Sequence, residues 1–365
     1  MMIYFFYIIF SFLILRFTVT LFNFISNPKL TRSPKFYNDL VSVLIPARNE
    51  AEDILTLLDS LKVQDYQNIE VIVLDDQSED HTFTVCEEFS KSDTRFKVIK
   101  GQPLKKGWLG KNYACYQLAN QAKGKYLLFL DADEQVKDGL INNAIYRMQI
   151  GKLSLLSLFT NQITETAGEK AIIPLMHYLL LNLLPLRLVK LSKMPSFSAA
   201  SGQFMLFDKV NYLKFQWHQL VKNMVVEDVE IMKKVKQNKL NGEALLANGF
   251  IYCRMYKGYK EGLDGFSKNL LAGFGGNIIG LMIYLLMVVF GPIMILIFLN
   301  FELFYFAVTL IIFSRIMISY LSGQNVLTNL FFHVFQMINL LIIAVLSIKK
   351  SLNKSLIWKG RTIHT

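Results

Sequence analysis

The chain has 365 residues, of which 53% are hydrophobic, and its formal net charge at pH 7 is +11. This length allows one large domain and a membrane part, because the apolar runs near both ends exceed what a soluble core requires. The positive charge suits anionic lipid and an anionic substrate. Nucleic acid is not expected as a partner, because the sequence has no recognition-helix, zinc or RNA-binding motif.

The first predicted element is an uncleaved membrane anchor over residues 1–25. The apolar run from Met2 to Leu15 continues past Arg16 to Ile25. It is long enough to cross about 30 Å of hydrocarbon if Arg16 reaches the interface or is paired. The run lacks the basic leader and the small-residue cleavage site of a signal peptide. A buried helix of a soluble protein is the alternative.

Basic residues predict the orientation of the chain. Lys29, Arg32 and Lys35 follow the anchor directly, in a polar linker over residues 26–39. Because basic residues collect on the cytoplasmic side of membranes, they place the middle of the chain in the cytoplasm. Three scattered cysteines, without disulfide or metal-ligand spacing, also indicate a reducing compartment.

Residues 40–269 predict an α/β domain. Apolar strands are expected at residues 40–45, 69–74, 96–99 and 126–130, and segments with helical spacing of apolar residues separate the first strands. This alternation is typical of a mostly parallel sheet with helices on both faces. The sequence does not predict a dinucleotide-binding Rossmann fold, because no Gly-x-Gly-x-x-Gly follows the first strand, and it has no kinase or P-loop motif.

Polar side chains follow these strands where each strand ends. Asp131 and Asp133 come directly after the fourth strand, Asp75 and Asp76 follow the second, and the first leads into Pro46, Arg48 and Glu50. Ligands bind at the carboxyl edge of open α/β sheets, and two closely spaced aspartates can hold a hard divalent cation against a diphosphate. Asp75 is placed to hold a base or ribose, whereas Asp80 or Ser78 is expected to cap the next helix.

A loop rich in lysine and glycine precedes the next predicted helix. It contains Lys105, Lys106, Gly107, Gly110 and Lys111. Glycines allow close backbone approach and a helix N-terminus favours an anion, so this loop suits an anionic ligand. A solvated surface loop is the alternative.

These segments, in this order, resemble the motifs of family 2 glycosyltransferases of the GT-A fold. The matching segments are residues 43–50, Asp75-Asp76 with Ser78 and Asp80, residues 106–111, and Asp131-Ala132-Asp133. The Gly107-Trp108-Leu109-Gly110-Lys111 element and the membrane runs are most similar to the bacterial branch of hopanoid-associated and carotenoid (diaponeurosporenoate-type) glycosyltransferases. The resemblance covers roughly residues 41–269.

The resemblance implies a donor half over residues 40–133 and an acceptor half over residues 134–269. Asp131 and Asp133 would hold Mg²⁺ or Mn²⁺, a Lewis acid for the departing nucleotide. The donor-binding residues that it implies are Pro46, Arg48, Glu50, Asp75, Asp76, Lys106, Gly107, Lys111, Asp131, Ser201, Gly202 and Arg254.

The acceptor half begins with an apolar segment over residues 171–191. Its prolines and charged residues predict an interfacial helix and not a membrane span, with a core helix as the alternative. The loop at Ser201 and Gly202 is expected to face donor and acceptor and to lead into a strand over residues 204–207. Glu227-Asp228 matches the family's acidic element, with Asp228 as the general base.

Residues 254–259 lie where processive relatives carry Gln-x-x-Arg-Trp, and that pattern is absent. The departure argues against a polysaccharide synthase. Arg254 and Lys257 are still expected near the diphosphate.

The C-terminal third predicts membrane helices within residues 278–348. The three apolar runs are residues 278–299 without charge, residues 303–321 with Arg315, and residues 326–348 with His333, Gln336 and Asn339. If all three crossed, the basic tail over residues 349–365 would end outside the cell, against the positive-inside rule. We therefore expect one run, in the first instance the Arg315 segment, to be interfacial or re-entrant, unless the tail breaks the rule.

Together these patterns predict a multi-pass membrane enzyme with a cytoplasmic catalytic domain. It would transfer a sugar, with inversion, from a nucleotide sugar, in the first instance a UDP-sugar, to a carotenoid, terpenoid or other membrane lipid. The alternatives are a polyprenyl-phosphate glycosyltransferase, a polysaccharide synthase, and a non-catalytic membrane protein that binds nucleotide.

Overall fold

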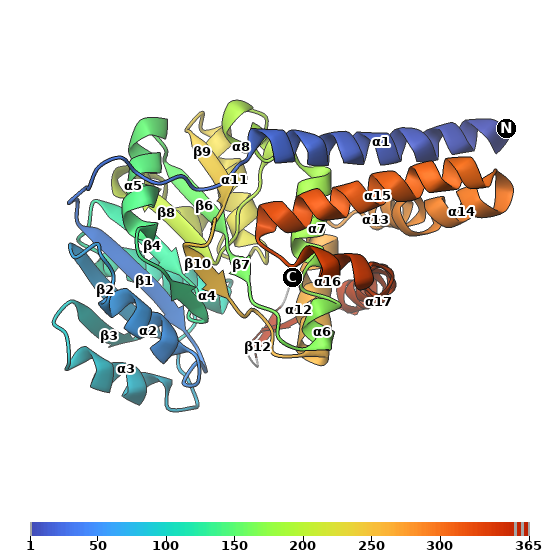
Figure 1. Cartoon of the computed structure of the whole chain (residues 1–365). Helices are drawn as coiled ribbons and strands as arrows, with labels where there is room; N and C mark the ends of the chain where they lie inside the picture. Colours follow the sequence, from blue (N-terminus) through green and yellow to red (C-terminus); the bar gives the residue numbers. More distant parts are fainter. Residues whose placement is uncertain (1, 354–355, 359–360, 364–365) are drawn as a thin grey trace.

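The computed structural model describes residues 2–353, 356–358 and 361–363. A globular part holds a central sheet, and a bundle of apolar helices extends from one side of it (Figure 1). Of the predicted basic tail, residues 354–355, 359–360 and 364–365 lie outside the described residues, and β11 (Leu356–Trp358) pairs with β12 (Arg361–Ile363).

The central sheet has seven strands in the order β3-β2-β1-β4-β8-β6-β9. All neighbours are parallel except β8, which is antiparallel to both β4 and β6. The mostly parallel sheet predicted from the sequence is therefore confirmed. The strands are β1 (Val41–Ala47), β2 (Ile69–Asp75), β3 (Phe96–Lys100), β4 (Tyr126–Leu130), β6 (Leu155–Phe159), β8 (Phe204–Asp208) and β9 (Gly242–Leu246).

Both faces of this sheet are buried, as continuous apolar strands require. Alternate residues of one strand enter different cores: Leu127 and Phe129 pack in one, whereas Leu128 and Leu130 pack in the other. Helices α2 (Ile54–Lys62) and α5 (Leu140–Gly151) supply one core, and α4 (Gly110–Gln121) and α11 (Glu227–Gln237) supply the other. The globular part is completed by α3 (Thr82–Ser90), α9 (Lys209–Phe215) and α10 (Trp217–Leu220).

A second, smaller sheet lies at the carboxyl edge of β4. Its order is β5 (Glu134–Val136), β10 (Ile251–Cys253) and β7 (Asn161–Gln162). The pairing of β5 with β10 sets Glu134 opposite Cys253. This sheet therefore brings the segment after Cys253 back to the edge where Asp131 and Asp133 leave β4.

The segment over residues 171–191 is divided in the structure, so the prediction of a single helix there was wrong; together with the four residues before it, the segment forms three short helices. They are α6 (Ala167–Lys170), α7 (Leu175–Leu183) and α8 (Leu188–Leu191), followed by a 3₁₀ turn, η1 (Pro195–Phe197). Breaks fall at Pro174 and Pro185, because proline lacks an N–H and clashes with the preceding helical turn. The position of these helices at a membrane surface stays a prediction.

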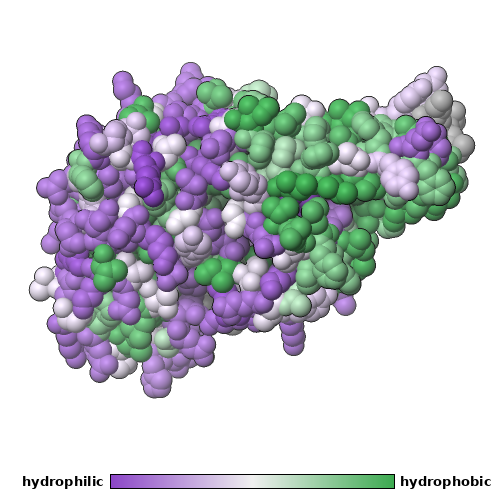
Figure 2. Space-filling model, in the orientation of Figure 1, coloured by the Kyte–Doolittle hydropathy of each residue, from purple (hydrophilic) through white to green (hydrophobic). Residues whose placement is uncertain are grey.

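Three long helical segments form the apolar bundle, which is green in Figure 2, whereas the globular part is mostly purple. They are α1 (Met2–Ser26), α15 (Phe301–Ser322), and a segment of α13 (Ile278–Leu285), a π-helical turn η2 (Leu286–Phe290) and α14 (Gly291–Phe298). Helices α1 and α15 run parallel: the Phe10 and Phe306 ring centroids, in the first halves of the two helices, lie 6.3 Å apart, and those of Phe24 and Tyr320, near their ends, lie 5.9 Å apart.

Arg16 and Arg315 both point into the bundle, where their side chains are buried. Arg16 therefore does not reach the membrane interface, which was one of the two possibilities that the sequence left open. The third predicted C-terminal run is divided at Phe332 into α16 (Val326–Phe331) and α17 (His333–Leu352). Helix α17 packs along α12 (Tyr259–Gly273), at the base of the bundle (Figure 1).

Within the part of the chain that the structure describes, four helical segments are long and apolar enough to cross a membrane: residues 4–26, 278–298, 301–322 and 333–352. Their length and composition agree with the predicted membrane segments at both ends of the chain.

Gly124 provides a test of the sheet packing. Its N–H donates to Ser42 Oγ over 2.7 Å, and an added Cβ would lie 2.5 Å from the Ser42 backbone nitrogen. We expect Gly124→Ala to lower stability by about 1–3 kcal/mol, because β1 must move to relieve the clash. Thermal unfolding in detergent would show a lower midpoint. Gly273→Ala is the control, because its Cβ would meet no heavy atom within 4 Å other than those of its chain neighbours and the backbone of its own helix. Equal midpoints for both variants would contradict the packing.

Candidate active site

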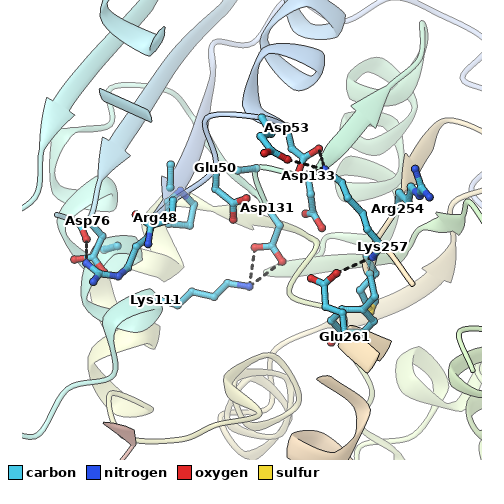
Figure 3. Close-up of a pocket in the computed structure, with 18 residues that line it drawn as sticks. Arg48, Glu50, Asp53, Asp76, Lys111, Asp131, Asp133, Arg254, Lys257 and Glu261 are labelled. Carbon is cyan, nitrogen blue, oxygen red and sulfur yellow. Dashed lines mark hydrogen bonds and ion pairs between the residues drawn. The ribbon is translucent and has the colours of Figure 1, made fainter. Parts of the chain in front are cut away.

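A cavity of about 470 Å³ opens at the carboxyl edge of β1 and β4 (Figure 3). Strands β1 and β4 pair in parallel from Val41 opposite Tyr126, so their carboxyl ends reach this edge together. Eight of the residues predicted to form the site line the cavity: Pro46, Arg48, Glu50, Asp76, Lys111, Asp131, Asp133 and Arg254. The clustering of these side chains at one edge of the sheet agrees with the strand-end prediction.

Lys111 occupies the first turn of α4, and its side chain reaches across to the end of β4. Its Nζ lies 2.7 Å from Asp131 Oδ1 and 3.6 Å from Glu227 Oε1. The three side chains are largely buried, with 24%, 27% and 12% of their surface exposed, respectively. In this arrangement, Lys111 neutralises Asp131 directly. A donor phosphate or a cation would compete for these same contacts.

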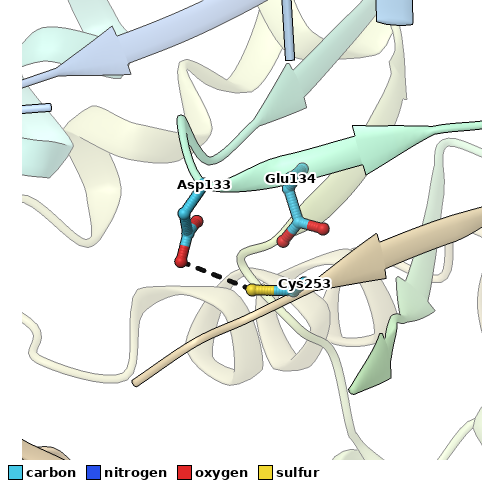
Figure 4. A group of neighbouring side chains, drawn as sticks. All are labelled: Asp133, Glu134 and Cys253. Atoms are coloured by element: carbon cyan, nitrogen blue, oxygen red, sulfur yellow. Dashed lines mark hydrogen bonds between the residues drawn. The ribbon is translucent and has the colours of Figure 1, made fainter. Parts of the chain in front are cut away.

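Asp133, two residues further along, faces a different group of side chains. Cys253 donates a hydrogen bond from Sγ to Asp133 Oδ2 over 3.3 Å, and Glu134 lies beside them (Figure 4). Ligand atoms of Asp133, Glu134 and Cys253 lie within 4.8 Å of one another. Glu134 is fully buried, and among the described residues neither of its carboxylate oxygens has a hydrogen-bond partner of normal geometry, although the Cys253 thiol lies near enough to interact. The sequence reasoning missed both Glu134 and Cys253.

Burial is the main cause that raises the pKa of both Asp133 and Glu134. Neighbouring carboxylates add to it: Asp131 and Glu50 act on Asp133, whereas Asp133 and Asp131 act on Glu134. Burial also raises the pKa of the Cys253 thiol well above its usual range, which keeps the sulfur protonated. The donor set is therefore carboxylate oxygen, which fits a hard divalent cation such as Mg²⁺ or Mn²⁺.

Glu227 and Asp228 begin α11, next to the Lys111 side of the cavity. Asp228 accepts hydrogen bonds from the Gly202 N–H at 2.9 Å and the Val229 N–H at 2.7 Å. Burial raises the pKa of both carboxyls, and Lys111 opposes this shift. A Cβ on Gly202 would lie 3.0 Å from Lys111 Nζ and 3.2 Å from Glu227 Oε1. Glycine at position 202 therefore lets the acidic element approach Lys111.

Arg48 orders the turns that follow β1 and β2. Its Nη1 donates to the carbonyl oxygens of Asp76 at 2.7 Å and Gln77 at 2.6 Å, and its Nη2 lies 3.1 Å from Glu79 Oε1. Asp75 ends β2 and is buried, but it does not line the cavity. Asp80 Oδ1 accepts the Thr82 N–H at 3.0 Å, so it binds the start of α3, while His81 is the N-cap residue.

A segment from the far end of the domain supplies the other wall of the cavity. Arg254 forms ion pairs with Glu165 at 2.7 Å and Glu169 at 2.9 Å, and Lys257 pairs with Asp53 at 2.8 Å. Both basic side chains line the cavity, and their contact with a diphosphate stays a prediction. Tyr256 and Glu261, which also line it, were not anticipated.

Several predicted residues lie outside the cavity lining. Lys106 and Gly107 are exposed in the loop before α4. Ser201 is buried, with its N–H and C=O bound to Ser157 Oγ at 2.7 Å and 3.1 Å. Gly202, Glu227 and Asp228 adjoin the cavity through Lys111. Their predicted roles, like those of the lining residues, stay predictions.

Comparison with known proteins identifies relatives of this chain. The family model "Glycosyl transferase family 2" matches residues 42–211. A 4,4'-diaponeurosporenoate glycosyltransferase of Staphylococcus haemolyticus is 30% identical over 240 residues, which are 64% of this chain and 61% of that protein. The protein of the same name from Staphylococcus aureus strain N315 is 28% identical over 271 residues, 72% of this chain and 69% of that protein. The match thus spans less than two thirds of the S. haemolyticus protein.

The fold also has a solved counterpart. The mannosyltransferase PcManGT from Pyrobaculum calidifontis, solved in complex with GDP-Man and Mn²⁺, superposes with a TM-score of 0.57. The identity is 16%, and the match covers 95% of this chain and 98% of that chain. The predicted GT-A fold with added apolar helices is thereby confirmed.

Lys111→Met tests the electrostatics of the site. Removing the ammonium leaves the Asp131 and Glu227 carboxylates without their cation. We expect the free energy of unfolding to fall by about 2–3 kcal/mol, less than the about 3–5 kcal/mol that breaking a fully buried pair costs. Because the pKa of Glu227 already lies above its ordinary 4.5, folding binds protons and stability falls as pH rises. The deficit should therefore be larger at about pH 8 than at about pH 5.5.

Thermal unfolding at both pH values measures this difference. Lys106→Met is the matched control, because that lysine is exposed in the preceding loop. A Lys111→Met deficit that does not depend on pH would show that Lys111 does not balance buried carboxylates.

Proposed function

Residues 42–211 of this chain form a glycosyl transferase family 2 domain, and on that premise we propose that the protein transfers a sugar from a nucleotide sugar to a membrane lipid. The observation that carries the proposal is the cavity at the carboxyl edge of β4. Asp131 and Asp133 lie there among Arg48, Lys111 and Lys257. Such a mixture of acidic and basic groups suits a nucleoside diphosphate with its cation.

The basic side chains of the cavity would bind the donor diphosphate. Lys111, at the N-terminus of α4, and Arg254 with Lys257, on the opposite wall, bring positive charge from two sides. Asp133, with Glu134 beside it and Asp131 nearby, would hold Mg²⁺ or Mn²⁺. When bound, that ion supplies a Lewis acid for the departing nucleotide. Pro46, Arg48 and Asp76 would line the nucleoside end.

Asp228 is the proposed general base for a hydroxyl acceptor. Two backbone N–H groups bind its carboxylate oxygens, which fixes the carboxylate beside Gly202. Oδ2 or Oδ1 would take the acceptor proton as the oxygen attacks the anomeric carbon opposite the diphosphate, which inverts the configuration. Glu227, bound to Lys111, would keep that ammonium in place.

A membrane lipid as the acceptor is supported by the apolar bundle and by the relatives. The bundle joins the domain closely: Asn23 of α1 donates to the carbonyl oxygens of Leu181 in α7 at 3.0 Å and of Leu184, just after α7, at 2.8 Å. The two relatives described above are named for a carotenoid acid. We therefore favour a carotenoid or another terpenoid with a hydroxyl or carboxyl group, and a UDP-sugar as donor.

The geometry of the bundle supports three membrane spans and not four. The far ends of α1 and α14 meet, since Phe6 and Phe298 lie 6.4 Å apart. Helix α15 is a continuous helix of 22 residues along α1, which supports assigning the Arg315 segment to a membrane span in place of the interface. Helix α17 instead turns polar residues to the domain: Gln336 donates to Lys170 O at 2.8 Å, and Tyr259 donates to Asn339 Oδ1 at 2.6 Å.

The other face of α17 is apolar and exposed, with Val334, Phe335, Ile338, Ile342 and Val345 at helical spacing. An amphipathic helix of this kind lies in the membrane interface. With α17 in the interface, Lys349 and Lys350 stay on the same side as Lys29 and Arg32, as the positive-inside rule requires. The conflict that the sequence left open is then resolved, with the domain and the tail in the cytoplasm.

Transfer of label from UDP-sugars and GDP-mannose into membrane lipid tests the function. Membranes containing the protein should label an organic-soluble lipid when Mg²⁺ or Mn²⁺ is present and lose this activity with a chelator. Asp133→Ala should abolish labelling, and Asp228→Asn should reduce it by about 100-fold or more, because a general base contributes at least that factor. Glu87→Gln, on an exposed face of α3, is the control and should keep full activity.

The nature of the labelled product separates the alternatives. Label in a terpenoid identified by mass spectrometry supports the proposal, whereas label in a polyprenyl phosphate or in insoluble polymer replaces it with the corresponding activity. No labelling with any donor, from folded protein in its native membrane, would contradict sugar transfer.

Cysteine accessibility tests the three-span arrangement. The native Cys86, Cys115 and Cys253 are buried and should give little background. In intact cells, Glu302→Cys, at the start of α15, should react with an impermeant maleimide, whereas Leu352→Cys, at the end of α17, should react only after permeabilisation. Lys97→Cys in β3 is the reference for the domain. Labelling of Leu352→Cys from outside would show that α17 crosses.

A further inference from the structure

Two arginines from different helices meet inside the apolar bundle. The guanidinium carbon of Arg16 lies 5.2 Å from the centroid of the Tyr178 ring, and that of Arg315 lies 4.2 Å from the same centroid. Arg16 also lies 5.7 Å from the Tyr284 ring centroid. Helices α1, α7, α13 and α15 therefore contribute one residue each to a single buried group of side chains. We call its two arginines, Arg16 and Arg315, the arginine pair.

The arginine pair has no anionic partner among the residues that the structure describes. The side chains are 5% and 1% exposed, and Nε and Nη2 of each have no hydrogen-bond partner. No ion pair joins either one to a carboxylate of the described chain. Tyr178 and Tyr284 lower the cost of burying these cations through their rings, and their side chains also interact with Arg16, but neutral tyrosines supply no counter-charge. A bound anion would therefore stabilise these two neighbouring like charges in the apolar bundle.

The surroundings indicate what kind of molecule carries that anion. Next to the pair in sequence, Leu15 and Phe313 are 61% and 53% exposed on the outside of the bundle. Arg16 lies ten residues from the end of α1 at Ser26, which is about 15 Å along a helix. An anion at this depth, beside outward-facing apolar side chains, belongs to an amphiphile and not to a soluble metabolite.

We propose that Arg16 and Arg315 bind the anionic group, a phosphate or a carboxylate, of a membrane lipid whose chains lie against the bundle. The planar guanidinium groups suit both anions, because each can form two parallel hydrogen bonds to a pair of oxygens. Neither arginine, nor Tyr178 or Tyr284, lines the cavity with Asp131 and Asp133. The inference therefore does not rest on sugar transfer.

Thermal unfolding of the purified full chain in neutral detergent tests this site. Phosphatidylglycerol supplies a lipid phosphate, oleate a lipid carboxylate, phosphatidylcholine a zwitterionic control, and inorganic phosphate a soluble anion. We expect phosphatidylglycerol or oleate to raise the unfolding midpoint by several degrees, and the responding lipid identifies the anionic group. Arg16→Gln and Arg315→Gln should abolish this rise. Arg32→Gln, which removes an exposed positive charge after α1, should keep it.

The variants also give a test that does not depend on added lipid. Arg16→Gln removes an unpaired buried charge, so in delipidated protein its midpoint should equal or exceed that of the wild type. A lower midpoint for Arg16→Gln and Arg315→Gln without lipid, together with an unchanged lipid response, would assign both arginines to packing alone. Equal stabilisation of the variants by anionic lipid, stabilisation by inorganic phosphate alone, or no stabilisation by any anionic lipid would overturn the proposal.

Discussion

The site depends on how carboxylates are kept together in a place from which water is largely excluded. Asp131, Asp133 and Glu134 leave β4 and enter β5, and Glu227 with Asp228 reaches the same region from α11. Burial and the repulsion of neighbouring carboxylates disfavour the charged forms of Asp133, Glu134, Glu227 and Asp228. Lys111 counters this on one side of the cavity, whereas on the other side Asp133 accepts a hydrogen bond from the Cys253 thiol, and no cation pairs with Asp133 or Glu134 among the described residues. Additional positive charge would therefore stabilise the Asp133–Glu134 side of the cavity more than the Lys111 side.

The membrane bundle is fixed to this site by polar contacts as well as by apolar packing. Thr20 and Asn23 of α1 bind α7 through side-chain hydrogen bonds, and Arg187 donates to the carbonyl oxygen of Ser26 at 3.0 Å. Hydrogen bonds of this kind have direction, so they specify the depth and rotation of α1 more closely than packing does. Because α7 follows α6, whose Glu169 binds Arg254, the same chain segment joins the bundle to the wall of the cavity.

The sequence predicted well those features that depend on local pattern. The first four strands were found because a strand buried on both faces is a short apolar run that ends in polar residues, and the lining of the cavity by Asp131 and Asp133 follows from their i, i+2 spacing. The same alternation explains why Asp76 reaches the cavity and Asp75 does not. Lys106 and Gly107 were expected at the site, but α4 begins only at Gly110, so they remain in the exposed loop before it.

Features that depend on long-range pairing were not predictable in this way. Cys253 meets Asp133 only because β10 pairs with β5, and no local pattern indicates that pairing. The position of α17 likewise depends on which of its faces meets α12, which hydropathy alone does not reveal. The prolines at positions 174 and 185 were visible, and their effect on helix continuity was underestimated. Where local composition was compatible with two structures, tertiary contacts thus determined which of them formed.

The course of the chain after β10 has a practical consequence. Arg254 to Lys257 form one wall of the cavity, α12 starts two residues later, and α17 is bound along α12 with its apolar face outward. The cavity wall is therefore connected through α12 to α17, whose outer surface is covered by acyl chains in the arrangement proposed above. Lateral pressure, acyl-chain length and curvature of the bilayer then become variables of the reaction. Kinetic constants from detergent micelles and from native membranes would describe differently supported forms of the same cavity.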